Sequence, residues 1–313
     1  MSTTTVPPST EPIPVRGQGL EPRQGGWFVR LAVIVIVVLW SIPTAGVLIT
    51  SFRPEALADS TGWWTSLAHP FRAGEWTMEN YRLALDAGGF GSAFLNSLAV
   101  AIPATVIPIT IAAFAAYAFS WMEFRGRYLM FITVVGLLVV PLQMALIPVL
   151  RLYNQGATIG RWIVFPDLDL NGTFLGVWLA HTAFGLPLAI YLLRNYIGSL
   201  PSSIIESARI DGADHFTIFW RLIIPLSVPA LAAFAIFQFL WVWNDLLVAY
   251  VFLGGTEETR VLTLALQGLV GREGENWHLL TAAAFISMAL PLVVFFALQK
   301  YFVRGLTAGA VKG

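Results

Sequence analysis

The chain has 313 residues, of which 57% are hydrophobic and only 12% are charged, so too few charged side chains are available to cover a water-soluble domain. The formal net charge of zero argues against a nucleic-acid-binding protein, and the absence of cysteine excludes a disulfide scaffold. Apolar and polar residues do not alternate along the sequence with the period of two that a transmembrane β-barrel requires. The composition therefore predicts an all-α, polytopic membrane protein.

The first 28 residues are rich in Pro, Ser, Thr and Gly, which is typical of a disordered tail. A cleaved signal peptide is the alternative, but its apolar stretch would begin sooner and be shorter. We therefore expect residues 1–28 to form a cytoplasmic tail that precedes a transmembrane domain over residues 29–304.

Charge-free windows locate the membrane spans, because one crossing needs about 20 apolar residues in a helix that pairs its own backbone groups. Five of six windows hold 22 to 24 residues, and the longer second one contains Gly88, Gly89 and Gly91, which predict an outer loop before a helix that begins near Ser92. The windows are 31–52, 87–122, 128–150, 170–193, 222–244 and 276–299.

The basic residues predict the orientation of these spans. With a cytoplasmic N-terminus, eleven Lys and Arg residues fall in inner segments and seven in outer ones, as the positive-inside rule requires. We therefore predict six transmembrane helices in the plasma membrane with both termini inside. The outer loop 53–90 carries Trp63, Trp64 and Trp76, which indicates an aromatic belt at the interface and a short surface helix.

Proline occurs in every predicted span, where it removes a helical hydrogen bond and kinks the axis. The kinks either serve ordinary packing or border a cavity that opens and closes, as in a transporter. The prolines are Pro43, Pro103, Pro108, Pro141, Pro148, Pro187, Pro229 and Pro291.

The sequence contains no recognisable machinery for catalysis or ATP hydrolysis. No nucleophile–base pair or paired metal-ligand spacing is present, and the only lysines, Lys300 and Lys312, are followed by Tyr and Gly rather than by the Ser or Thr of a phosphate loop. We therefore expect no cofactor and no metal in this chain, and any pumping must use energy from a partner.

Few polar groups fall within or beside the spans. His181 is the one histidine well inside a span, where it either makes an interhelical hydrogen bond or contacts a substrate. Asn244 and Asp245 are expected near the outer end of span five, where they either anchor the helix at the interface or line a translocation path. The spans hold no buried carboxylate, which disfavours an ion-coupled carrier.

The inner connection 195–224 is the most informative stretch. Ser203 and Glu206 have capping-box spacing that predicts a helix from about Ile204, and Gly212 supplies the left-handed turn that ends it. Asp214 is suited to cap the next helix, in which Phe216, Phe219, Trp220 and Ile223 recur on one face. This helix–turn–helix elbow either lies on lipid or docks into a cytoplasmic partner.

The residues of this elbow carry a family resemblance. Glu206-Ser-Ala208, Asp211-Gly212-Ala213, Phe216 and Pro225 resemble the EAA loop of binding-protein-dependent ABC importers, with departures at Ser207 and Ile224, where the family usually has Ala and Leu. Trp243-Asn244-Asp245 and the ending from Arg304 to Gly313 are similar to the shorter, six-helix permease of maltose-type carbohydrate importers. The resemblance runs from about residue 30 to residue 313.

The resemblance implies a type I ABC importer permease fold and a role as one of two homologous or identical permease subunits that form the channel. It implies four kinds of partner: a second permease, two ATPase subunits that bind ATP and Mg²⁺, an extracytoplasmic sugar-binding protein, and the sugar itself. The sugar would be a di- or oligosaccharide such as an α-glucoside. The chain itself would not be an enzyme. An ion-coupled secondary carrier is the alternative, and a membrane enzyme comes third.

The resemblance also implies two contacts with the ATPases. The elbow would be the coupling helix, and the cytoplasmic tail 305–313 would order between the ATPase subunits although alone it should be disordered. The implied coupling residues are Glu206, Ala208, Arg209, Asp211, Gly212 and Ala213, and the implied tail contacts are Gly305, Leu306, Thr307, Gly309 and Lys312.

Overall fold

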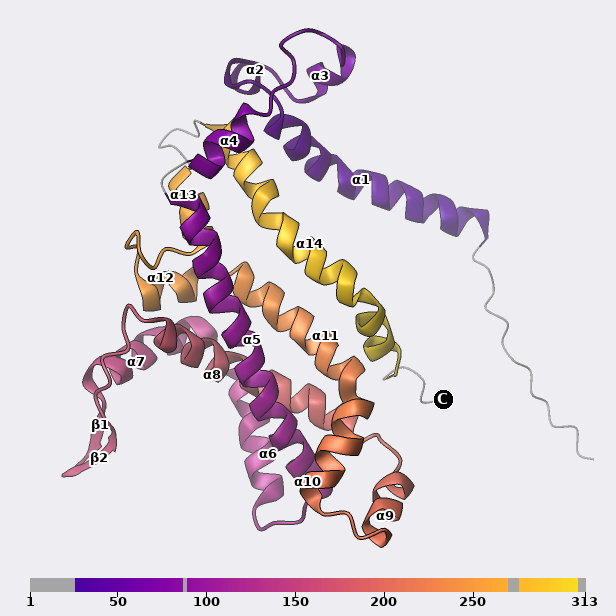
Figure 1. Cartoon of the computed structure of the whole chain (residues 1–313), viewed down its shortest axis with the longest axis vertical. Helices are drawn as coiled ribbons and strands as arrows, with labels where there is room; N and C mark the ends of the chain where they lie inside the picture. The colour runs from indigo at the N-terminus through magenta and orange to yellow at the C-terminus, as the bar shows by residue number, and fades with distance from the viewer. Residues whose placement is uncertain (1–25, 87–88, 270–275, 309–313) are drawn as a thin grey trace, which may run out of the picture. The chain divides into compact units, whose positions relative to one another are not determined.

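A computed structural model of the chain describes residues 26–86, 89–269 and 276–308, and these are mostly helical (Figure 1). Among them, five helices are long and apolar enough to cross a membrane, and the number rises to six when one bent pair is counted as a single span. The prediction of a helical, multi-spanning protein is therefore confirmed. The five are α1 (Trp27–Ser51), α5 (Phe90–Trp121), α8 (Phe174–Ile197), the continuous stretch His215–Trp243 and α14 (Trp277–Ala308).

The chain divides into two units, residues 1–45 and residues 46–313. The described part of the first unit is almost entirely helix α1, which begins at Trp27 and carries exposed apolar side chains such as Trp40. The helix thus starts two residues inside the predicted tail 1–28, whose residues 1–25 lie outside the described part of the chain.

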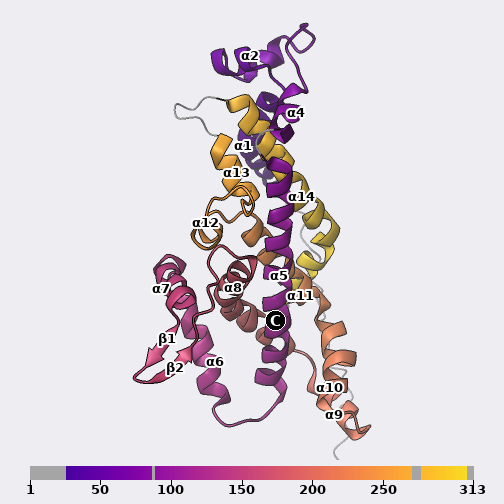
Figure 2. The same cartoon turned by 60° about the vertical axis from the view of Figure 1, so that its left-hand side comes forward.

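Three short helices, rather than the single surface helix that we predicted, form a cap between α1 and α5. They are α2 (Glu55–Ser60), α3 (Trp64–Ala68) and α4 (Glu79–Asp86). In Figures 1 and 2 this cap lies at the end of the second unit opposite to α9 and α10, and both α2 and α4 contact α14. Helix α5 then begins at Phe90 after Gly89, whose φ of 82° is left-handed, close to the predicted start.

The third predicted span is not continuous. Helices α6 (Arg127–Gly136) and η1 (Leu137–Val139) are separated from α7 (Leu142–Gln155) by a bend of 108°. Proline at position 141 explains the break, because it lacks an N–H group and disfavours helical geometry at Val140, whose ψ is 117°. The span predicted over 128–150 is therefore not one continuous helix, and the bent pair makes a sixth span only when its two helices are counted together.

A small β-hairpin follows α7 and is the exception to an all-α fold. Strands β1 (Ala157–Ile159) and β2 (Trp162–Phe165) pair antiparallel, with Thr158 opposite Ile163 and Ile159 opposite Trp162. The connection between them passes through Gly160, whose φ is 61°. Sequence inspection missed this hairpin because its strands are only three and four residues long.

Helix α5 is the centre of the transmembrane bundle, where it packs against α8 and α11 (Ile224–Trp243), while α14 packs on α11 (Figures 1 and 2). Small residues make the close approach possible, because Ala101, Ala104, Ala112 and Ala116 of α5 are fully buried. Buried residues form two clusters, one toward the cap and one toward α9 and α10.

The remaining elements follow α11. Helices α12 (Leu247–Leu253) and α13 (Leu262–Leu269) lead to α14, which continues past the predicted end at residue 299 to Ala308. The backbone at Gly305, Leu306 and Thr307 is thus helical, which differs from the disordered tail that we expected to begin at residue 305. Gly309 and Lys312 lie outside the described residues.

A candidate coupling elbow and a polar contact between spans

The elbow consists of α9 (Ser202–Ile210), a tight turn and α10 (His215–Ile218). Helix α9 begins directly after Pro201, whose φ of −60° suits the N-cap position, so Ser203 lies within the first turn. The predicted capping box between Ser203 and Glu206 is therefore wrong, because an N-cap residue must stand outside the helix.

The turn at the end of α9 is a Schellman motif. Gly212 has a φ of 83°, its N–H donates to the Arg209 carbonyl at 3.0 Å, and the Ala213 N–H donates to the Ala208 carbonyl at 2.9 Å. These two bonds pair carbonyls that the helix end leaves open. The left-handed turn predicted at Gly212 is confirmed, and the spacing from Ala208 to Ala213 matches the span of the motif.

Asp214 caps the next helix, as predicted. One of its carboxylate oxygens accepts a hydrogen bond from the Thr217 N–H at 2.8 Å. Hydrogen bonds from Thr217 hold the pKa of the Asp214 carboxyl below its usual range, so the group is charged at neutral pH.

The second elbow helix continues into span five without a break. A π-helical turn, η2 (Phe219–Ile223), joins α10 to α11. The wider π turn accommodates Pro225, because this proline has no N–H to donate and its ring would crowd the carbonyl of the preceding turn in a regular α-helix. The elbow is thus rigidly attached to a membrane helix, which the predicted span 222–244 did not anticipate.

Buried apolar side chains attach the elbow to the bundle. Ile205 and Ile218 are exposed to only 2% and 1%, and they pack in the same cluster as the inner ends of α5 and α8. Two polar contacts add to this attachment, a 2.8 Å hydrogen bond between the Tyr117 hydroxyl and Nδ1 of His215, and a 3.1 Å bond from Arg209 to the Trp121 carbonyl. The inward-facing residues of the elbow therefore pack on protein.

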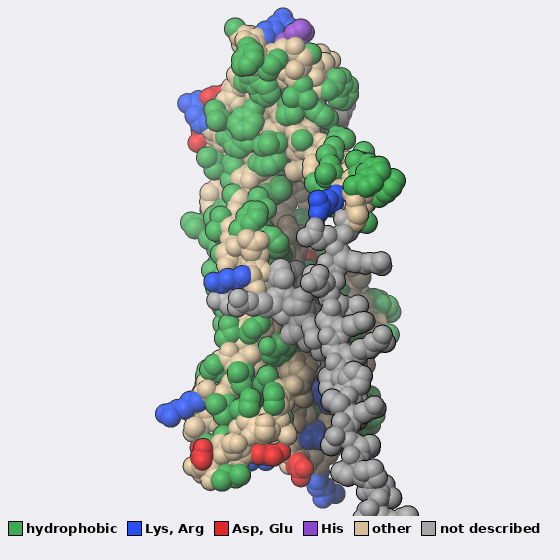
Figure 3. All heavy atoms as spheres, turned by 90° about the vertical axis from the view of Figure 1, so that its right-hand side faces the viewer, with side chains coloured by type: hydrophobic (Ala, Val, Ile, Leu, Met, Phe, Trp, Pro, Cys, Tyr) green, Lys and Arg blue, Asp and Glu red, His purple; other side chains and the backbone are tan. Residues whose placement is uncertain are grey.

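The opposite face of the elbow is free to meet a partner. Glu206, Asp211 and Gly212 are exposed there, whereas Ala208 and Ala213 are half-buried. Arg209 is also exposed, although its guanidinium bonds to the Trp121 carbonyl of the bundle. Ile210 is 86% exposed among these charged neighbours. Figure 3 shows acidic and basic side chains gathered at the end where α9 and α10 lie, next to a surface on which hydrophobic side chains predominate.

Asp245 connects three helices near the end of α11. Its carboxylate accepts a 2.9 Å hydrogen bond from the Ala249 N–H in α12 and lies 3.8 Å from Nε2 of His181 in α8. Its carbonyl accepts a 2.7 Å bond from the Thr263 hydroxyl of α13. Asn244, by contrast, is exposed and its side chain bonds only within its own helix, to Leu240 at 2.8 Å.

Sequence inspection did not foresee that His181 and Asp245 meet, because the two residues lie on different spans. The interhelical hydrogen bond predicted for His181 is not formed with any described residue, although its side chain is fully buried. The nearest polar group is the Asp245 carboxylate, and Trp241 lies edge-on to the imidazole with ring centroids 6.1 Å apart.

A cavity of about 270 Å³ lies beside this contact. The break between α6 and α7 forms one wall, and α8 and α11 form the others. Trp241 lines the cavity and also contacts His181, so the polar pair and the cavity share a wall. The lining residues are Leu137, Leu138, Val140, Leu142, Ala145, Ala183, Phe184, Pro187 and Trp241.

A bundle of apolar helices with a charged elbow and a cavity at a broken span is an arrangement that suits a membrane permease. The sequence profile of the family described as "binding-protein-dependent transport system inner membrane component" matches residues 108–308, and the chain belongs to this family. It is a multi-pass protein of the inner, or plasma, membrane and a permease subunit of a binding-protein-dependent importer. Family membership decides against the ion-coupled carrier.

Several relatives match over nearly the whole chain, including the two that follow. The osmoprotective compounds uptake permease protein GgtD of Synechocystis sp. is 59% identical over 284 residues, which is 91% of each chain. The alpha-glucoside transport system permease protein AglG of Rhizobium meliloti is 45% identical and covers 92% of this chain and 97% of its own.

A solved structure shows a similar fold. A chain of a bacterial alginate ABC transporter, in complex with an alginate pentasaccharide-bound periplasmic protein, superposes with a TM-score of 0.61. It covers 86% of this chain and 92% of its own, at 13% sequence identity.

Proposed function

We propose that this permease forms half of a channel that imports a sugar or a sugar-derived solute, such as an α-glucoside, into the cytoplasm. The similarity to permeases named for alpha-glucoside transport and for uptake of osmoprotective compounds supports this substrate class. A second homologous permease would complete the channel, and an extracytoplasmic sugar-binding protein would deliver the solute.

Two separate ATPase subunits would drive the import and would bind ATP and Mg²⁺, so that this chain itself has no cofactor and is not an enzyme. The observation that carries this proposal is the elbow, whose inner face is buried in the bundle while its charged outer face is exposed. A binding event at the elbow moves the conformational equilibrium only if it is stronger in one state than in the other. A rigid elbow continuous with span five transmits such a difference directly to the membrane.

Ile210 provides the test of this role. An apolar side chain that is 86% exposed between Arg209 and Asp211 is suited to a pocket on a partner. We expect Ile210→Asp to release the ATPase subunits during purification of the assembled importer. Ile163→Asp is the matched control, because Ile163 is 72% exposed on the hairpin. Retention of the ATPases by Ile210→Asp would contradict the proposed docking.

The tail after α14 is the second proposed ATPase contact. Because α14 continues through Gly305, Leu306 and Thr307, the helix itself would carry these residues toward the ATPases, with Gly309 and Lys312 following. This extends the proposal from the elbow to the C-terminus of the chain.

The translocation path would run past Asp245 and the neighbouring cavity. The first turns of α12 and α13 both bond to Asp245, one to its carboxylate and one to its carbonyl. The cavity lies at the bend between α6 and α7, and a change in helix packing would open or close it. We expect Asp245→Ala to lower solute uptake while basal ATP hydrolysis by the importer persists. Asn244→Ala is the matched control, because the Asn244 side chain bonds only to its own helix. Equal uptake by the two variants would contradict a specific role of Asp245 in the path.

A further inference from the structure

Three prolines lie inside long helices that nevertheless stay continuous. Helix α5 contains Pro103 and Pro108, and α14 contains Pro291. A proline has no N–H group, so the carbonyl four residues earlier loses its helical partner. An unpaired carbonyl inside a helix bundle is costly, and each of these carbonyls therefore needs another donor. The freed carbonyls belong to Ala99, Ala104 and Ser287.

Side chains of neighbouring helices supply the donors that α5 lacks. The indole of Trp178 in α8 donates to the Ala99 carbonyl at 2.8 Å. The amide of Gln238 in α11 donates to the Ala104 carbonyl at 3.1 Å. Each proline of α5 is therefore bridged by a hydrogen bond that ties α5 to another helix, where a regular helix would have a bond within itself.

The same arrangement joins α11 to α14. The indole of Trp243 in α11 donates to the Ser287 carbonyl at 3.2 Å, and Trp243 is exposed to only 4%. Ser287 stands four residues before Pro291, so this bond also replaces one that a proline removes. We call these three contacts the proline-bridging bonds.

Gln238 is enclosed where three helices meet. Its side chain is fully buried, and Gly185 of α8 leaves it room, because a Cβ on Gly185 would lie 2.7 Å from the Gln238 amide. The amide oxygen has no hydrogen-bond partner among the described residues. An apolar side chain would fill the same space without the cost of burying an amide, so the bond to Ala104 accounts for a glutamine here.

The proline-bridging bonds stand at the points where these helices bend most easily. A missing backbone bond makes a helix less stiff, and prolines are common sites of helix kinks. Because the donor sits on another helix, bending at the proline and movement of that helix depend on each other. Helix α11 supplies two of the three donors and continues through η2 and α10 into the elbow.

We propose that Gln238 and Trp243 are positioning residues for transport, through which a displacement of α11 bends α5 and α14. The hinges are Pro108 in α5 and Pro291 in α14, and Trp178 ties α8 to the other proline of α5. This proposal rests on the proposed function, in which the ATPases displace the elbow. The bonds persist while the helices bend, because breaking one would leave a buried carbonyl and its donor unpaired.

Double-mutant cycles on the assembled importer test whether a side-chain donor replaces the missing N–H. Pro108→Ala restores that N–H, so Gln238→Leu should lower the thermal stability less in the Pro108→Ala background than in the wild type. Pro108→Ala with Trp243→Phe is the matched control, because Trp243 bonds to α14, and these two effects should add. Additive effects of Pro108→Ala and Gln238→Leu would overturn the assignment.

Uptake by the reconstituted importer separates a coupling role from support of the fold alone. Gln238→Leu should lower the solute taken up per ATP hydrolysed by about threefold, the factor in an equilibrium constant that matches an average interhelical hydrogen bond in a membrane. Pro108→Ala/Gln238→Leu should regain thermal stability but not uptake, since both the hinge and its bridging bond are gone.

Two results would overturn the coupling role. One is wild-type uptake in Gln238→Leu, and the other is recovery of uptake together with stability in Pro108→Ala/Gln238→Leu, which would show that the bond only supports the fold. If the wild-type importer hydrolyses ATP without taking up solute, the proposed function fails instead. The stability cycles still report on the bonds in that case, so the two failures are distinguishable.

Discussion

Replacement of Gly212 by Val tests whether the Schellman turn of the elbow couples ATP hydrolysis by the partner subunits to conformational change in the transmembrane bundle. Gly212 has a φ of 83°, a conformation that a β-branched residue adopts only with strain. No described atom other than those of its own chain neighbours lies within 4 Å of the position that a Cβ would occupy. The substitution therefore perturbs the backbone of the turn without creating a steric clash.

The magnitude follows from the cost of the left-handed conformation. A side chain with a Cβ pays about 1–2 kcal/mol there. A penalty of this size reduces the ratio of intact to altered turns by about 5- to 30-fold. Gly212→Ala should have a smaller effect than Gly212→Val, because alanine is not β-branched, so the loss of transport should be graded with the strain.

The assay compares solute uptake and stimulated ATP hydrolysis by the reconstituted importer, with membrane insertion measured in parallel. Gly126→Val is the matched control, since Gly126 has a φ of 82° and equally open surroundings but lies in another loop. We expect uptake to fall in Gly212→Val while insertion stays normal and the Gly126 variant stays near wild type. Wild-type transport by Gly212→Val, or an equal loss in the control, would refute a specific coupling role for the turn.

Three further outcomes are expected. Gly185→Ala would place a Cβ 2.7 Å from the side-chain amide of Gln238. The overpacking between α8 and α11 should lower the free energy of unfolding by about 1–3 kcal/mol, and unchanged thermal unfolding in detergent would contradict this packing. Tyr117→Phe removes the 2.8 Å hydrogen bond to His215 and should destabilise the packing of the elbow on the bundle by about 0.5–1.5 kcal/mol. Limited proteolysis should then cleave the elbow faster, and a wild-type cleavage rate would count against the bond. Deletion of residues 306–313 should reduce solute-stimulated ATP hydrolysis without preventing insertion, and full stimulated activity would show that this tail makes no important contact.

The sequence by itself determined those features that depend on local chemistry. The length of the charge-free windows located the spans. In the hydrocarbon, backbone N–H and C=O groups find hydrogen-bond partners only within their own helix, so each span must be a long apolar helix. The roles of Gly212 and Asp214 were also predictable, since a left-handed turn favours glycine and an N-cap favours a short acceptor side chain. The capping box failed because Pro201 starts the helix earlier, and Ser203 then falls inside it.

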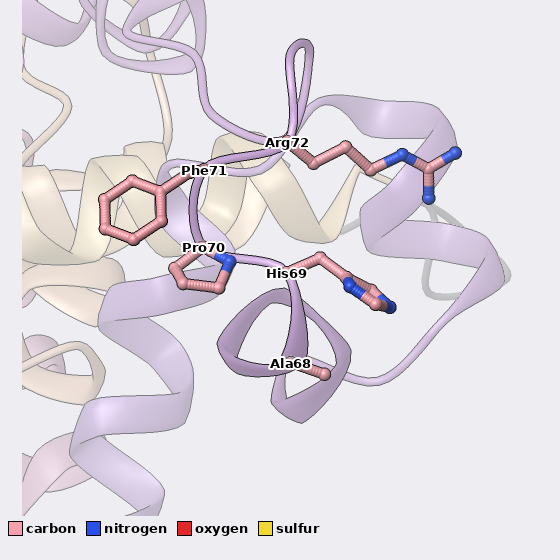
Figure 4. A pocket seen from close by; sticks show the side chains of 5 residues that line it. All are labelled: Ala68, His69, Pro70, Phe71 and Arg72. Carbon is pink, nitrogen blue, oxygen red and sulfur yellow. The ribbon is translucent and has the colours of Figure 1, made fainter.

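The tertiary structure decided what depends on neighbours far apart in the chain. Every span contains proline, yet in the described spans only Pro141 stands at a break of 108°, because the effect of a proline depends on how adjacent helices pair the freed backbone groups. The contact between His181 and Asp245 and the cavity beside it arise only when α8 and α11 pack together. Likewise the 99% exposure of Phe71 (Figure 4) could not be predicted from its position in an aromatic-rich loop, because exposure depends on how the residues around it fold.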